Sequence, residues 1–298
     1  MNSVLTKDKR VIVGAVRRLT KRQLYPFVES LKASGYSGDC VFFCTSTSHE
    51  AYRYLEEHAI RLVPFSYPAI RNHQPLLYGW SIWRSLLEWL PNREQKLKLA
   101  RLVWDLFFLR FLFARDFLTA HSEYSQIMLT DVRDVVFQRD PFAWMENRKG
   151  VFCFEEMQGR TIGECKSNSR MVREVFGEEG WNKLQGFQIS CAGVTFGTRT
   201  ELLKYLERFL DLALGALSLR PCSGSDQGIH NRIAHLENLR DLTLLNNEGP
   251  VFTMGCVPEE CIRVNAIGEV VTKQGDVYSV LHQYDRFPGL AKRFYSVQ

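Results

Sequence analysis

Two aspartates directly follow an apolar run in the middle of the sequence. The run Gln126–Thr130 is typical of a buried strand, and Asp131 and Asp134 come immediately after it. Carboxylate oxygens are the ligands that Mg²⁺ and Mn²⁺ prefer in proteins. A divalent ion held there could neutralise the charge that grows on a leaving diphosphate, with no proton transfer. We therefore expect Asp131 and Asp134 to hold Mn²⁺ or Mg²⁺.

A histidine near the C-terminus is the third candidate ligand. His282 follows the strand-like segment 276–281, and a neutral imidazole is a competent ligand for Mn²⁺. Arg286, four residues later, carries a planar guanidinium suited to a diphosphate. A lone histidine is more often structural than a ligand, so the structural alternative stays open.

One arginine lies on the apolar side of a long helical pattern. The segment 94–120 is apolar around most of its circumference, and Arg110 points about 180° away from Arg101 at 100° per residue. A buried unpaired charge is costly, so Arg110 needs an anionic partner. We expect that partner to be Asp131 or Asp134. A structural salt bridge elsewhere is the alternative.

The elements that must position these residues alternate along the first third of the chain. An order of strand, helix, strand, helix and strand implies an α/β fold with a Rossmann-like, mostly parallel sheet flanked by helices. Such sheets bind ligands beyond the carboxyl ends of their strands. The expected strands are 11–16, 40–44, 60–65, 126–130, 151–154 and 187–196, and the expected helices are 21–34, 50–58 (capped by Ser48), 80–89, 94–120, 200–217 and 226–235. The segment 64–75 is expected to be a loop. The segment 158–185 is expected to contain loops and short helices.

The acidic segment resembles that of the GT-A fold glycosyltransferases, in which a short Asp-x-Asp motif ends a central strand. The chain is most similar to a bacterial and plant-type subgroup that carries D-V-R-D-V-V-F-Q, the sequence of residues 131–138 here. The resemblance covers roughly the first strand to His282. It departs from the wider pattern in having Asp131-x-x-Asp134. Alignment on Val135-Val136 and Asp140-Pro141 makes Asp134 the equivalent of the usual metal ligand and leaves Asp131 one residue off register. Asp131 could then bind ribose or metal through a local bulge, or pair with Arg133.

Three further segments resemble that family. Residues 190–197, S-C-A-G-V-T-F-G, are similar to a small-residue strand that lines the acceptor side, although an ordinary core strand fits equally well. The Asp226–Gln227 pair resembles the segment beneath the donor sugar in glycogenin-type transferases, which would make both residues catalytic. The alternative is a helix start capped by Ser225. His282 matches the position of a third metal ligand. The resemblance also implies donor binding by Asp131, Arg133, Arg286 and Arg110.

The composition and the absence of certain motifs argue against several other classes of protein function. The net charge of +5 suits an anionic ligand but is too small to indicate nucleic acid. No G-x-G-x-x-G follows the first strand, and neither a P-loop nor a G-x-S-x-G elbow occurs. Charges interrupt the Leu- and Phe-rich stretch 97–118, which argues against a spanning helix. None of the eight cysteines forms a C-x-x-C pair, so a structural zinc site is not expected. The polar N-terminus lacks the apolar core of a signal peptide, which favours a cytoplasmic protein with reduced thiols and leaves peripheral contact at the inner membrane face open.

These observations together predict one GT-A domain over residues 1–298. Residues from about 10 to 156 would bind the nucleotide sugar, and residues from about 157 to 290 the acceptor. The expected function is metal-dependent transfer of a sugar from a nucleotide-diphosphate donor to an unidentified glycosyl acceptor. Two alternatives remain: a catalytically silent sugar- or nucleotide-binding module on this fold, and a nucleotidyltransferase or phosphatase that uses the same acidic pair.

Overall fold

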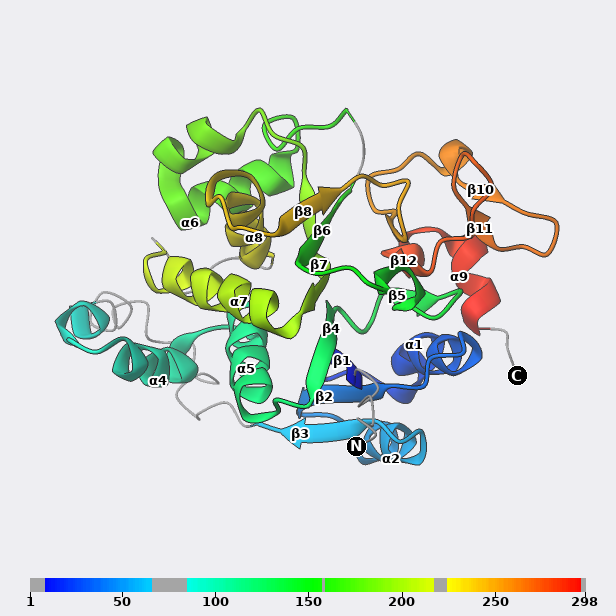
Figure 1. Ribbon diagram of the computed structural model, residues 1–298, viewed down its shortest axis with the longest axis horizontal. Helices are drawn as coiled ribbons and strands as arrows, with labels where there is room; N and C mark the ends of the chain where they lie inside the picture. The colour runs from blue at the N-terminus through cyan, green and yellow to red at the C-terminus, as the bar shows by residue number, and fades with distance from the viewer. Residues whose placement is uncertain (1–8, 66–84, 157–158, 217–223, 296–298) are drawn as a thin grey trace, which may run out of the picture.

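The computed structural model describes residues 9–65, 85–156, 159–216 and 224–295 (Figure 1). Most of the loop expected over 64–75, and the beginning of the helix expected over 80–89, lie outside these ranges. Residues 85–89, the rest of that expected helix, are helical.

A mixed, mostly parallel sheet of seven strands forms the centre of the molecule, in the order β3-β2-β1-β4-β7-β6-β8. Only β7 runs antiparallel to its two neighbours, β4 and β6, while the other adjacent pairs are parallel. The strands are β1 (Lys9–Arg17), β2 (Asp39–Thr45), β3 (Arg61–Pro64), β4 (Tyr124–Thr130), β6 (Val151–Glu155), β7 (Ser190–Thr198) and β8 (Leu242–Leu245). The predicted α/β class and the predicted strand positions are confirmed.

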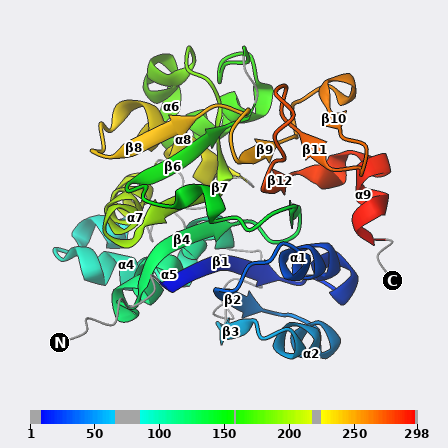
Figure 2. The same cartoon turned by 45° about the vertical axis from the view of Figure 1, so that its right-hand side comes forward.

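Helices cover both faces of this sheet (Figures 1 and 2). On one face α1 (Lys21–Ala33) and α2 (His49–Glu57) close a core with the side chains of alternate strand residues, such as Ile12 and Met128. On the other face α5 (Leu106–Ala120), α7 (Arg199–Leu214) and α8 (Ser225–Leu236) pack on Val13 and Leu129. Period-two alternation in the strands therefore feeds two separate cores.

The first two helices begin where the sequence indicates. Thr20 forms a capping box with Gln23, and the Ser48 hydroxyl accepts a hydrogen bond from the backbone N–H of Ala51. These caps satisfy N–H groups that have no partner within the helix. Ser225, in contrast, is not a cap as the sequence suggested. It is the first residue of α8, after Gly224, whose φ of 90° places it in the left-handed region.

The long helix predicted over 94–120 is wrong, because the chain forms two helices there. α4 (Arg93–Val103) ends at Trp104, which is extended and fully buried, and α5 starts after Asp105. The break turns Trp104 into the core beside Phe108, at a ring-centroid distance of 5.7 Å. Helical periodicity alone does not reveal this break, since every residue around it is compatible with a helix.

The polar segment after β6 contains more regular helix than expected. α6 (Lys166–Leu184) is interrupted at Gly177, whose φ of 67° is not helical, so it consists of two shorter helices joined by a kink. Glycine adopts such angles without the steric cost paid by other residues. No helix among the described residues has the length and apolar character needed to span a membrane.

A second, small sheet brings the C-terminal part of the chain to the acidic segment. β12 (Val280–His282) pairs antiparallel with β5 (Val135–Phe137) and parallel with β9 (Val251–Thr253). In this register His282 lies opposite Val135, the residue after Asp134, and opposite Thr253. The remaining elements are β10 (Arg263–Val264), β11 (Val270–Val271), α9 (Pro288–Tyr295) and the short 3-10 turns η2 (Ala143–Met145), η3 (Glu259–Cys261) and η4 (Tyr284–Arg286).

Candidate metal centre

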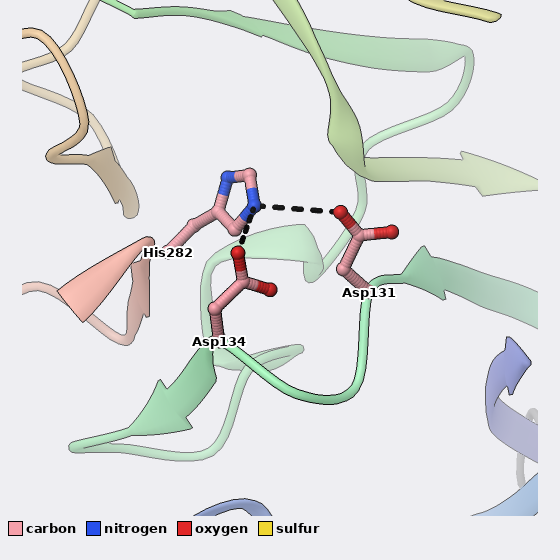
Figure 3. A group of neighbouring side chains, drawn as sticks. All are labelled: Asp131, Asp134 and His282. Atoms are coloured by element: carbon pink, nitrogen blue, oxygen red, sulfur yellow. Dashed lines mark ion pairs between the residues drawn. The ribbon is translucent and has the colours of Figure 1, made fainter. Parts of the chain in front are cut away.

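Three side chains from two distant parts of the sequence converge beyond the end of β4 (Figure 3). Asp131 and Asp134 lie in the turn between β4 and β5, and His282 ends β12. His282 Nε2 lies 3.6 Å from Asp131 Oδ2 and 3.9 Å from Asp134 Oδ2. One ligand atom from each residue can be chosen so that all three lie within 4.8 Å of one another.

These separations suit shared coordination better than direct hydrogen bonding. Both distances from Nε2 exceed the normal hydrogen-bond range, and this buried atom has no hydrogen-bond partner among the described residues. Two ligands about 2.1 Å from one ion lie between roughly 3.0 and 4.2 Å apart. A mixed carboxylate and imidazole set fits Mn²⁺ and also other first-row divalent ions. The residues present therefore fit a divalent ion, whose identity they leave open.

Weak donors and acceptors hold the far side of the imidazole. His282 Nδ1 lies 3.5 Å from Cys191 Sγ and 3.4 Å from Thr253 Oγ1. If Nδ1 carries the proton and donates to these atoms, Nε2 keeps the lone pair that a metal ion needs. Sequence reasoning missed Thr253 and the role of Cys191. Thr253 reaches His282 because β9 pairs with β12, and Cys191 reaches it from β7, a strand of the large sheet.

A glycine beneath His282 makes room for its ring. A Cβ atom at Gly193 on β7 would lie 2.2 Å from His282 Cε1, 2.4 Å from Nε2 and 2.9 Å from Asp131 Oδ2. The backbone N–H of Asp131 also donates to the Gly193 carbonyl oxygen over 2.7 Å. The small-residue strand noted in the sequence thus has an observed role beside His282.

Burial and neighbouring groups shift the pKa values of all three candidate ligands. Burial raises the pKa of Asp134. Burial also opposes the charge on Asp131, but the nearby Arg110 and His282 outweigh it and lower the pKa of Asp131. Burial disfavours a charged His282, yet Cys191 and Asp131 raise the pKa of this imidazole well above its ordinary value. The carboxylates of Asp131 and Asp134 face Nε2, as a cation site requires.

Arg110 makes the contact that its position on an apolar helix predicts. Its Nη1 donates to Asp131 Oδ1, and its Nη2 donates to Asp226 Oδ2 over 2.6 Å and to the Ala192 carbonyl oxygen over 3.2 Å. The predicted pairing with Asp131 is thus confirmed, and Asp226 is an additional partner. Asp226 is buried on α8, and that burial raises its pKa despite the guanidinium.

Gln227 uses its side-chain amide within the protein. Its Oε1 accepts from the backbone N–H of Ala192 over 3.1 Å, while Nε2 donates to Glu156 over 2.7 Å and to Asn168 over 3.0 Å. The amide therefore ties α8 to β7 and to the end of β6. Glu156, a buried carboxylate in this network, was not singled out by the sequence.

The two remaining arginines donate to other parts of the protein. Arg133 does not pair with Asp131: its Nη2 donates to Asp285 over 2.9 Å, while Arg110 donates to Oδ1 of Asp131. Arg286 is exposed, and its Nη1 donates to the Gly255 carbonyl oxygen over 2.9 Å. Arg133 directly precedes the candidate ligand Asp134, and Arg286 follows the candidate ligand His282 by four residues.

A pocket opens beside the three ligand residues. Its volume is about 440 Å³, within the range of roughly 300–1,000 Å³ that small-molecule sites occupy. The carboxyl end of β1, the first turn of α5 and the acidic turn form its walls. Its lining includes Arg17, Leu19, Phe107, Arg110, Asp131 and Asp134.

Comparison with known proteins finds neither a protein-family model nor a curated sequence that matches this chain.

Proposed function

We propose that the protein is a divalent-metal-dependent glycosyltransferase of the GT-A type, which transfers a sugar from a nucleotide-diphosphate donor. The observation that carries this proposal is the convergence of Asp131, Asp134 and His282 next to a pocket of about 440 Å³. The family that the sequence resembles places its acidic motif after a central strand and its histidine near the C-terminus. β4 and β12 supply both features here.

The residues of the site would have different tasks in the proposed reaction. Asp131, Asp134 and His282 would hold the ion, which when bound would stabilise negative charge on the leaving diphosphate. The pocket between β1, α5 and the acidic turn would take the nucleoside. Arg133 belongs to the same turn as the two aspartates, and 59% of its side chain is exposed, so it can contribute charge to a bound diphosphate.

Asp226 is not itself a candidate ligand, but Arg110 links its carboxylate to Asp131. Its side chain is 4% exposed, and Arg110 holds one of its oxygens. In the proposed reaction it orients the donor sugar from beneath. At saturating Mn²⁺, Asp226→Asn should lower turnover by about 10² or more with little change in donor affinity, as expected for an interaction made mainly in the transition state.

A donor screen tests the proposal. Thermal unfolding is measured with a panel of nucleotide-diphosphate sugars, each with and without Mn²⁺, because a ligand that binds only the folded state raises the unfolding temperature. A donor found in this way is then labelled in its sugar and incubated with the protein. Release of the intact sugar, to water or to an acceptor, supports glycosyl transfer. Release of a sugar phosphate would indicate a nucleotidyltransferase or phosphatase instead, and binding without turnover a silent module.

A further inference from the structure

A carboxylate–guanidinium–carboxylate bridge connects the candidate metal centre to α8. Arg110 extends from α5 and donates through Nη1 to Asp131 and through Nη2 to Asp226. The side chains of Arg110 and Asp226 are only 16% and 4% exposed, so water screens this contact poorly. The bridge therefore transmits a change of charge at one end more strongly than a surface ion pair would.

Asp131 uses different oxygens for the bridge and for the metal centre. Oδ1 accepts from Arg110, whereas Oδ2 lies 3.6 Å from His282 Nε2 (Figure 3). Arg110 thus fixes the rotation of this carboxylate and leaves one oxygen directed at the ligand cluster. Asp226 is outside that cluster, so it can influence an ion there only indirectly, through Arg110 or through the field of its own charge.

The charges of these groups balance a divalent ion. An imidazole must be neutral to ligate an ion. With His282 in that form, the carboxylates of Asp131, Asp134 and Asp226 and the guanidinium of Arg110 carry a summed charge of −2. If Asp226 alone is neutralised, the summed charge is −1. The guanidinium of Arg110 then has no other carboxylate partner in the bridge and competes with the ion for Asp131. Neutralising Arg110 and Asp226 together restores −2.

We propose that Asp226 and Arg110 are positioning residues of the metal centre, and that Asp226 raises the affinity for the divalent ion by sharing the charge of Arg110. This inference rests on the metal centre of the proposed function but not on sugar transfer. It assigns to Asp226 a task separate from any contact with the donor. It also makes the affinity for the ion depend on a residue that does not ligate it.

Titration calorimetry with Mn²⁺ alone, on the full-length protein, tests the inference. Asp226→Asn should weaken Mn²⁺ binding about 10-fold or more, because the partly buried site loses one negative charge. The double variant Arg110→Gln with Asp226→Asn should recover an affinity within about 3-fold of the native protein. Asp211→Asn is the matched control and should leave Mn²⁺ binding unchanged. Asp211 on α7 accepts from Arg93 on α4 over 2.5 Å, in an ion pair outside the metal centre.

Native Mn²⁺ affinity in Asp226→Asn would overturn the inference, as would a double variant as weak as the single one. The double variant replaces the bridge by two amides that can bond to each other, so it remains informative if the single variant does not fold. A native protein without Mn²⁺ binding would refute the metal centre itself, and with it the proposed function. Mn²⁺ binding that follows these charges, without any sugar transfer, would refute the transferase alone.

Discussion

Gly193 lies directly against the imidazole of His282, so closely that the methyl side chain of an alanine at this position would overlap the ring. A Cβ atom at this position would be 2.4 Å from Nε2, the atom that faces both aspartates. The strand that contains Gly193 is central and buried, which leaves little room for the backbone to yield. The glycine is therefore tied to the position of His282.

Gly193→Ala should weaken Mn²⁺ binding by about 10-fold or more, since His282 or Asp131 must move, and overpacking should cost about 1–3 kcal/mol of stability. Gly197→Ala on the same strand is the control. Its Cβ would be crowded by Leu202 and the Gly150 carbonyl at 3.0 and 3.2 Å, away from the three ligands. It should lose stability and keep its Mn²⁺ affinity. Calorimetry with thermal unfolding measures both quantities, and native Mn²⁺ binding by Gly193→Ala would contradict the prediction.

The second prediction concerns cooperation between metal and nucleotide. Mn²⁺ should tighten the binding of a nucleoside diphosphate by about 10-fold or more, because the diphosphate oxygens can complete the coordination shell. Asp134→Ala and His282→Ala should each abolish most of that gain. The controls Asp276→Ala and His49→Ala change exposed residues outside the site and should retain it. If His282→Ala keeps the full Mn²⁺ effect, His282 is structural and the ion depends on the acidic pair alone.

Local patterns predicted most of the central fold. The apolar runs of β1, β2 and β4 and the capped starts of α1 and α2 are visible in short windows of sequence, because burial and capping act on neighbouring residues. The break at Trp104 was missed, since it results from the burial of one indole against other elements rather than from any helix-breaking residue.

The site could be predicted only in part for a similar reason. A lone arginine on an apolar helix predicts an acidic partner, and Arg110 has Asp131. That the same guanidinium is shared with Asp226 depends on how α5 and α8 meet over the sheet. The environment of His282 likewise depends on the register of β12 against β9, which places Thr253 beside Nδ1. Such long-range pairings leave no mark in a single sequence.

The third prediction compares Trp104, which is buried between α4 and α5, with Trp89, which is exposed just before α4. Trp104 is fully buried against Phe108, so Trp104→Ala should lower the free energy of unfolding by about 3 kcal/mol. Trp89 is 87% exposed, and Trp89→Ala should change it by no more than about 0.5 kcal/mol. Urea unfolding followed by circular dichroism measures both. Similar losses in the two variants would show that Trp104 is not a core residue.

The last prediction concerns pH and a buried histidine that is not a candidate metal ligand. His230 on α8 is fully buried between Ser190 Oγ and the Tyr205 hydroxyl, each 2.7 Å from one ring nitrogen. Burial lowers the pKa of His230 from 6.5 to about 3, so the folded protein keeps this ring neutral at mildly acidic pH. The unfolded chain takes up the proton near pH 6.5. Between about pH 6.5 and 3 the unfolded state therefore binds more protons, and stability must fall as the pH falls.

Through this group alone, the free energy of unfolding should be roughly 2 kcal/mol lower at pH 5 than at pH 7, at about 1.4 kcal/mol per unit of pKa difference. His230→Gln should be less stable than the native protein at pH 7, because it loses one of two buried hydrogen bonds, but its stability should decline less steeply toward pH 5. His49→Gln, at the exposed start of α2, should show the native slope. Urea unfolding at pH 5, 6 and 7 gives the three slopes. Equal slopes for His230→Gln and the native protein would mean that His230 does not resist protonation in the folded state.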